Sequence, residues 1–512
     1  MNKGASRTIN SLRNSWFAIV GQGINIILQF LLRTVFIMTL GIEYLGVNGL
    51  FTNILTVLAL TELGIGTAIV ISLYKPLAEN NINKINALMN WFKKIYAAIG
   101  TFIFLIGITL IPFLDYLIKD SPDVGNLNVI YILFLIDSSV TYFFAHYRSL
   151  LNADQKGYID SLNKIVFSFI QILLQIVILL VLGNFYMYLI IRIIIHILSG
   201  YVISLKAKKI YPYLNNKGRS RLDPNEIKGL VRNALAMFSH KMGFVVLNST
   251  DSIIISSFIG TVAVGLYSNY YLLISTVGTL LSLVVAAIQA SVGNLYATSD
   301  EKKIYNIFLK INFMYAWIYG YCAICLYVLV SPFITVWIGR DYLMDISIVA
   351  IIVLNFYLQG MRQSVLVFTT ANGLFYNMRF KPIFEVAINL VVSLVLVQSL
   401  GMVGVFLGTL ISTILTSFWY EPYTLYSKGF KKSTMNYFIK YFWYTLVVVI
   451  TAVITKYLSD LIANESILDF LIKMGIVIIL PNFIFIVVFF RSKEFKSVYT
   501  TIRSLIYRKL FG

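Results

Sequence analysis

Ionisable side chains stand inside several long apolar segments of this chain. A charged group inside a hydrocarbon layer is costly on most scales, so such residues face a wet cavity or a partner of opposite charge. The residues placed in this way are Arg33, Glu62, Asp137, Arg192, His196, His240, Lys241, Asp251, Arg362 and Glu385. Arginine offers a planar fork of donors that matches phosphate oxygens, and a carboxylate at this depth can take up a proton or a sodium ion. The pattern therefore predicts a site for an anionic group together with groups that bind a cation.

The sequence contains no strong candidate for a catalytic, redox or metal-binding group. Cys322 and Cys325 lie one helical turn apart in an apolar segment, and we find no Cys or His partners at the spacing of a zinc site, so we interpret them as packing residues. The sequence has no GxxxxGK[ST] phosphate loop and no nucleophile–base constellation that outranks chance. We therefore expect a protein that is not an enzyme and that has no cofactor or metal site.

Apolar helices must hold these residues in place. The 512 residues are 59% hydrophobic and only 12% charged. Runs of about 20 apolar residues cross a hydrocarbon core of ~30 Å, and we count about fourteen of them. Residues 44–73 are the second of these spans, and residues 231–259 are the seventh. The predicted fold class is an all-α polytopic membrane protein.

A duplication organises these helices. Residues 12–99 recur as residues 231–318 at one constant offset, which pairs Arg13 with Arg232. A duplicated set of membrane helices is typical of a transporter whose halves rock about a central cavity. Because each copy has an even number of spans, we expect two six-helix lobes related by an axis along the membrane normal, followed by two extra helices.

Within such a transporter, seven of the buried ionisable residues form the predicted site. The residues expected to bind an anionic headgroup in the cavity are Arg33, Arg192, Arg362 and Lys241. The residues expected to act in coupling or gating, with H⁺ or Na⁺ as the coupling ion, are Glu62, Asp137 and Asp251. The alternative for each is a structural ion pair between helices or a side chain that reaches toward the interface.

The net charge of +19 is placed to set membrane orientation. Lysine and arginine gather in every second connection, and the short connections between them carry acidic residues instead. This positive-inside pattern predicts that both termini are cytoplasmic and that the basic surplus contacts anionic lipid headgroups. Nucleic acid is therefore not an expected partner.

The repeat and the charge pattern divide the chain into five parts. They are an N-lobe at 1–205, a basic cytoplasmic connector at 206–230, a C-lobe at 231–427, two further spans at 428–490 and a basic amphipathic cytoplasmic tail at 491–512.

Two sequence runs resemble a known family. They are RTVFIMTLGIEYLGVNGLFTNIL at Arg33–Leu55 and ELGIGTAIVISLYKPLAE at Glu62–Glu79, with a TANG segment at Thr370–Gly373. They resemble bacterial polysaccharide repeat-unit flippases of the Wzx type. These belong to the multidrug/oligosaccharidyl-lipid/polysaccharide (MOP) exporter superfamily, together with lipid II flippases and MATE drug exporters.

The resemblance implies a substrate and a mechanism. Proteins of this type move undecaprenyl-pyrophosphate-linked oligosaccharides from the inner to the outer leaflet of the bacterial cytoplasmic membrane by alternating access, for capsule, exopolysaccharide or O-antigen assembly. A headgroup role is thereby carried onto Arg33, and a coupling role onto Glu62. We expect a monomer that works beside a polysaccharide polymerase. The alternatives are an ion-coupled drug or metabolite exporter and, from another class, a membrane enzyme acting on lipid-linked sugars.

Overall fold

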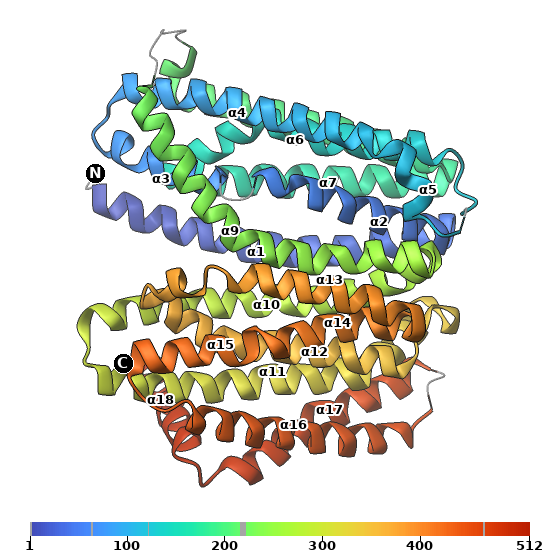
Figure 1. Cartoon of the computed structure of the whole chain (residues 1–512), viewed down its shortest axis with the longest axis vertical. Coiled ribbons are helices and arrows are strands. Elements are labelled where there is room, and N and C mark those ends of the chain that lie inside the picture. Colours follow the sequence, from blue (N-terminus) through green and yellow to red (C-terminus); the bar gives the residue numbers. More distant parts are fainter. Residues whose placement is uncertain (1–2, 63–64, 121, 216–221, 464–465, 512) are drawn as a thin grey trace. The chain divides into compact units, whose positions relative to one another are not determined.

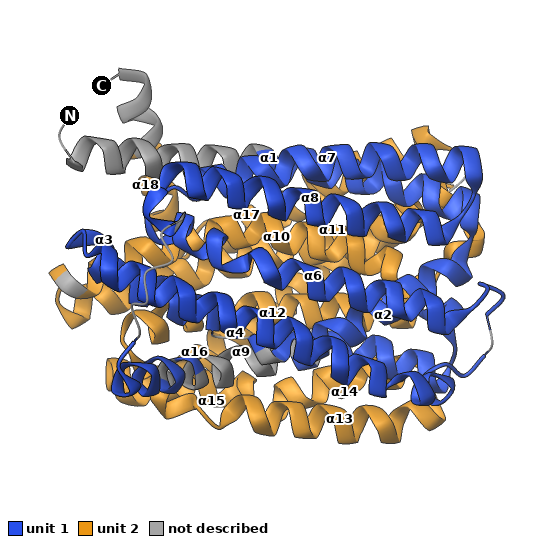
Figure 2. Ribbon diagram, turned by 90° about the horizontal axis from the view of Figure 1, so that it is seen from above, with its two compact units in different colours: residues 1–265 blue, residues 266–512 orange. Residues whose placement is uncertain are grey.

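A computed structural model describes residues 3–62, 65–120, 122–215, 222–463 and 466–511 (Figure 1). All regular secondary structure in these residues is helical, as the apolar runs predict. Two compact units divide the chain, residues 1–265 and residues 266–512 (Figure 2).

The first unit contains nine α-helices and three short 3-10 helices among the described residues. They are α1 (Lys3–Leu40), α2 (Ile42–Leu58), η1 (Ala59–Glu62), α3 (Ile65–Ala78), α4 (Ile82–Thr109), η2 (Ile111–Phe113), α5 (Leu114–Leu117), α6 (Leu127–Ala153), α7 (Gly157–Leu182), α8 (Phe185–Ile210), η3 (Pro212–Asn215) and α9 (Pro224–Phe258). Helix α1 packs along α7, and α6 lies between α4 and α8 (Figure 2). Large apolar side chains such as Leu73, Phe92 and Leu150 fill the core between α3, α4 and α6.

The second unit contains nearly all of α10 and the helices that follow it. They are α10 (Thr261–Thr298), α11 (Glu301–Ile338), η4 (Arg340–Tyr342), α12 (Ile346–Ala371), η5 (Leu374–Met378), α13 (Lys381–Leu400), α14 (Met402–Leu415), α15 (Ser417–Thr424), the π-helix η6 (Leu425–Phe430), α16 (Met435–Asp460), α17 (Ile467–Phe489) and α18 (Lys493–Phe511). Helix α13 packs on α14, and α11 contacts α12, α16, α17 and α18.

The boundary between the two compact units is set by packing, whereas the lobe boundary that we expect is set by the sequence repeat. The compact units divide after Gly265, because α9 packs against α2 and α3 of the first unit. The expected lobes at 1–205 and 231–427 follow the repeat in the sequence, and they stay a prediction.

Twelve helices of the described residues are long and apolar enough to cross a membrane, which confirms a multi-pass membrane protein. Two of the expected spans, residues 44–73 and residues 231–259, are not among these twelve helices. Residues 44–73 are broken into the short apolar helices α2 and α3 by η1. Residues 231–258 lie in α9 (Pro224–Phe258), a long helix that carries charged residues, among them Lys228, Arg232 and Asp251.

The connections between helices also follow the sequence repeat, because residues with positive φ occur at equivalent positions in both copies. Gly41 and Gly260 both have positive φ, of 86° and 137°, and they stand at the offset that pairs Arg13 with Arg232. Gln155 (φ 58°) and Gly373 (φ 68°) follow equivalent helices, and Gly183 (φ 55°) and Gly401 (φ 57°) end the next pair. A left-handed residue ends a helix and redirects the chain, so the duplication extends to the connections.

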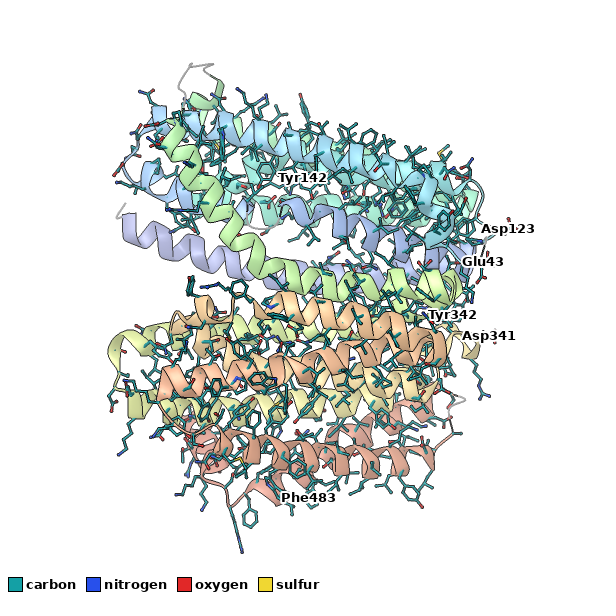
Figure 3. All side chains as sticks on the ribbon, in the orientation of Figure 1. Glu43, Asp123, Tyr142, Asp341, Tyr342 and Phe483 are labelled. Carbon is teal, nitrogen blue, oxygen red and sulfur yellow. The ribbon has the colours of Figure 1, made fainter. Side chains whose placement is uncertain are left out.

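Acidic residues of the expected outer connections meet at one end of the first unit. The backbone N–H of Asp123 donates to Glu43 Oε2 at 2.8 Å (both labelled in Figure 3). The loop before α6 is thereby tied to the first turn of α2.

Candidate functional site

A polar cavity of about 760 Å³ lies inside the first unit. Its lining comes from α1, η1, α6, α7 and α8. Gln22, Asn25 and Gln29 line it from α1 at helical spacing, so they share one face of that helix. Ser168 and Gln171 line it from α7, and Ser168 Oγ donates to Asn25 Oδ1 at 3.2 Å. The cavity therefore offers amide and hydroxyl groups, which pair with the hydroxyls of a polar ligand.

One cluster of charges joins α6 to α8 beside this cavity. Arg192 Nε lies 2.9 Å from Asp137 Oδ2, and His196 Nδ1 lies 2.6 Å from Asp137 Oδ1. The Arg192 guanidinium also lies 4.5 Å from the centre of the Phe134 ring. His196 lines the cavity, whereas Asp137 is buried. The structure thus brings together two predicted site residues, Asp137 and Arg192. His196 joins them because residues four apart on α8 face the same way.

A second cluster, at the start of α7, escaped the sequence analysis. Arg148 Nη1 of α6 lies 2.5 Å from Asp160 Oδ1, and Lys164 Nζ lies 2.8 Å from Asp160 Oδ2. Arg148 Nη2 donates to Ser199 Oγ of α8 at 3.3 Å. The Asp160 side chain is 5% exposed and that of Lys164 is 61% exposed, and both Arg148 and Lys164 line the cavity. The available signal was the Asp160–Lys164 spacing at the start of an apolar helix, which puts both on one face.

Glu62 lines the cavity from η1. It lines the same cavity as Tyr142 of α6, which is labelled in Figure 3. Tyr96 lies near it, since a Cβ on Gly66 would stand 3.2 Å from the Tyr96 hydroxyl and 4.0 Å from Glu62 Oε1. The break between α2 and α3 therefore places a carboxylate at the cavity edge.

A third cluster lies in the second unit. Arg362 of α12 makes two bonds to Glu421 of α15, Nη2 to Oε1 at 2.7 Å and Nε to Oε2 at 3.0 Å. Arg362 Nη1 lies 3.3 Å from Glu385 Oε1 of α13. Lys381 Nζ lies 2.6 Å from Glu421 Oε1 and 3.0 Å from Glu385 Oε2. The two cations and the two carboxylates of this cluster therefore form ion pairs with one another.

The remaining predicted residues are Arg33, Asp251 and Lys241. Arg33 is half-buried on α1, and its headgroup role stays a prediction. Asp251 is buried on α9, where its neighbour Ser252 accepts a hydrogen bond from Asn53 at 3.1 Å. Lys241 falls in α9, but its side chain lies outside the described residues. The residues that sequence reasoning missed are Arg148, Asp160, Lys164, Lys381 and Glu421.

Solved structures share this architecture. The lipid II flippase MurJ, in an inward closed conformation, matches with a TM-score of 0.63 at 16% identity, over 98% of this chain and 99% of that chain. An inward-facing multidrug resistance MATE family transporter of the MOP superfamily matches with a TM-score of 0.61 at 17% identity, over 79% and 97%. A MOP superfamily transporter from Pyrococcus furiosus matches with a TM-score of 0.53 at 16% identity, over 83% and 96%. This likeness defines the class of the protein as a polytopic helical membrane protein with the MOP fold, as predicted.

The family follows from the sequence. Residues 11–292 match the family described as "Polysaccharide biosynthesis protein", and because this is more than half of the chain, the protein belongs to that family. A comparison with the curated proteins finds no match. The resemblance recognised in the runs Arg33–Leu55 and Glu62–Glu79 is confirmed, since both lie within the matched residues.

Proposed function

We propose that this protein is a flippase for undecaprenyl-pyrophosphate-linked oligosaccharide repeat units. It moves them from the inner to the outer leaflet of the bacterial cytoplasmic membrane for capsule, exopolysaccharide or O-antigen assembly. The observation that carries the proposal is the family match over residues 11–292, the stretch that contains the whole polar cavity of the first unit.

The chemistry of the cavity supports a glycan-bearing substrate. A cavity of about 760 Å³ is within the usual range for small-molecule sites. Its amides and hydroxyls suit sugar hydroxyls, while Lys164 and Arg148 suit phosphate oxygens. Helical membrane proteins keep polar groups within the hydrocarbon region only where they line a cavity or have partners.

The proposed mechanism is alternating access between the two repeats. The headgroup is captured by cationic side chains when the site opens inward, and the glycan is released when it opens outward. In this proposal both termini are cytoplasmic, the protein works as a monomer, and a polysaccharide polymerase consumes the product. In this mechanism the protein binds and encloses the headgroup and the glycan, and it needs no catalytic residue.

Complementation tests the proposal. The chain is expressed in strains that lack their own repeat-unit flippase and that carry different glycan pathways, with surface polymer and the pool of lipid-linked repeat units measured together. We expect restored surface polymer and a falling pool in at least one pathway. A pool that stays high in every pathway, with the protein verified in the membrane, contradicts the proposal.

A drug or metabolite exporter is the second candidate, because the fold is shared with a MATE family transporter at a TM-score of 0.61. It predicts a different result in the same strains. Expression would change susceptibility to cationic dyes and leave the pool of lipid-linked repeat units unchanged.

A further inference from the structure

Charged and uncharged polar side chains line the cavity at different levels of α7. Lys164 lies near the start of the helix, where it shares Asp160 with Arg148. Ser168 and Gln171 line the same cavity about one and two turns farther along. Because an α-helix rises about 1.5 Å per residue, the positions of Lys164 and Gln171 are about 10 Å apart along its axis. The level that suits phosphate is therefore separated from the level of the amides by more than the length of one sugar ring.

The cavity-facing side of α1 lies at the level of the uncharged groups. A Cβ on Gly21 would clash with the side chain of Ile165. About one turn farther along both helices, Ser168 Oγ donates to Asn25 Oδ1 at 3.2 Å. The two contacts advance in the same direction, so α1 and α7 run parallel here. Gln29, one turn after Asn25, therefore lines the cavity at the amide level of α7.

The amides at this level keep both donors and acceptors for a ligand. Gln171 Nε2 donates to Gln175 Oε1 at 3.3 Å, and Gln175 Nε2 donates to the Tyr188 carbonyl oxygen at 3.1 Å. These contacts leave the Gln171 carbonyl oxygen and its second amide hydrogen for another partner. Asn25 accepts from Ser168 through Oδ1, which leaves both hydrogens of Nδ2. Sugar hydroxyl and acetamido groups donate and accept, so they match this mixture.

A carboxylate on the ligand is poorly matched at the amide level. It only accepts hydrogen bonds, so the amide carbonyl oxygens would face a negative charge. Among the described lining residues, Lys164 and Arg148 supply cations at the other level, and His196 is paired with Asp137. Glu62 adds a carboxyl group to the lining. Like charges repel strongly where the dielectric constant is lower than in water, and such mismatches are a source of specificity.

We propose that Asn25, Gln29 and Gln171 form a sugar subsite of the first unit, which selects an uncharged sugar with hydroxyl or acetamido groups over a hexuronic acid. The subsite holds the second sugar of the repeat unit, because it lies about 10 Å along α7 from Lys164, the residue that suits the phosphates. This inference rests on the proposed function and names the class of glycan that the chain carries.

Binding of synthetic lipid-linked sugars tests the subsite. The full-length protein in lipid nanodiscs is titrated with a short polyprenyl pyrophosphate, with the same lipid carrying N-acetylglucosamine and then glucose, and with the same lipid carrying N-acetylglucosamine and then glucuronic acid. We expect the wild-type protein to bind the glucose probe about tenfold more tightly than the glucuronic acid probe, and more tightly than the sugar-free probe.

Two variants should remove this preference. In Gln171→Lys and in Gln29→Lys, the new ammonium group pairs with the carboxylate of glucuronic acid, so the ratio of the two Kd values should fall to about one or reverse. Both disaccharide probes carry the same pyrophosphate, so the ratio is insensitive to a general gain in phosphate affinity.

Gln398→Lys is the matched control. Gln398 is an exposed residue of α13 in the second unit, and it is not part of the cavity lining. The same change of charge at this position should keep the wild-type ratio of Kd values. The melting temperature of each variant verifies that it is folded.

The outcomes separate the subsite from the function. Equal wild-type affinity for the two disaccharide probes, or tighter binding of the sugar-free probe than of both, overturns the subsite and leaves the proposed function standing. An unchanged ratio in both Gln171→Lys and Gln29→Lys overturns the assignment to these residues. If the wild-type protein binds none of the three probes, the proposed function fails, and the subsite fails with it.

Discussion

The two units treat buried charge differently. In the second unit, Arg362 and Lys381 meet two carboxylates, and the Arg362 and Glu421 side chains are 13% and 1% exposed. In the first unit, Arg148 and Lys164 share one carboxylate, Asp160, and Lys164 is 61% exposed at the cavity. The cluster of Arg148, Asp160 and Lys164 has a positive surplus in contact with a cavity, whereas the cluster in the second unit is balanced within itself.

The difference in charge balance between the two clusters involves helices that are equivalent in the repeat. The offset that pairs Gln155 with Gly373 and Gly183 with Gly401 also pairs Ile203 with Glu421. The apolar residue Ile203 therefore stands in the first unit where the second unit has its shared carboxylate. Duplication copied the helices and their turns, but the charges diverged. We infer that charge balance separates a structural cluster from one that acts on a ligand.

The largest expected effect comes from breaking the balance of the second unit. Glu421→Gln leaves Arg362 and Lys381 with one shared carboxylate in a buried place, so the free energy of unfolding should fall by about 3–5 kcal/mol. Thermal unfolding of the purified protein measures this loss. Asp460→Asn is the control, because it breaks the more exposed Lys456–Asp460 pair, where a change of about 0–1 kcal/mol is expected. Equal melting temperatures would contradict the structural role of the cluster.

A smaller loss of stability is expected when the carboxylate shared by two cations in the first unit, Asp160, is neutralised. Asp160→Asn leaves Arg148 and Lys164 close together, but both border a wet cavity that screens their repulsion. The expected loss is about 1–3 kcal/mol, from the unmet hydrogen bonds of the buried residue. The same thermal unfolding experiment ranks it, and a loss larger than that of Glu421→Gln would reverse the comparison.

The smallest effect on stability is expected at Lys164, with a clear effect on export. Lys164→Gln should change the free energy of unfolding by no more than about 0.5 kcal/mol, because its side chain is largely exposed. The rate of surface-polymer formation should fall if Lys164 binds the substrate, and Lys164→Arg should retain it. Lys456→Gln, from a pair with the same four-residue spacing, serves as the control. Normal export with Lys164→Gln would show that the cavity cation does not act on the substrate.

Much of the fold could be predicted, because membrane burial makes helices long, apolar and easy to count. The repeat that pairs Arg13 with Arg232 predicted two copies of one set of helices. The run Arg33–Leu55 predicted the family. The break at η1 was harder to place, since short apolar helices and one long helix have similar hydropathy.

The site could be predicted only in part. Depth in a span singled out Asp137 and Arg192, which the structure places in one cluster, whereas His196, the third member of that cluster, was not among the predicted site residues. Arg148 and Lys381 were counted with the basic connections, because a charge near the end of a span is normally solvated. Asp160 and Glu421, which pair with them, lie on other helices, and the spacing along one helix carries no information about which other helix is adjacent.

The most direct test is to replace the balanced pair of the second unit. The double variant Arg362→Met/Glu421→Leu removes one charge of each sign and leaves the Lys381–Glu385 pair, with its 3.0 Å contact, in place. Surface polymer is measured in the complemented strain beside Lys164→Gln. We expect the double variant to export near the wild-type rate and Lys164→Gln to export poorly. Loss of export in a folded double variant, with normal export in Lys164→Gln, would place the ligand-binding charge in the second unit and contradict the account.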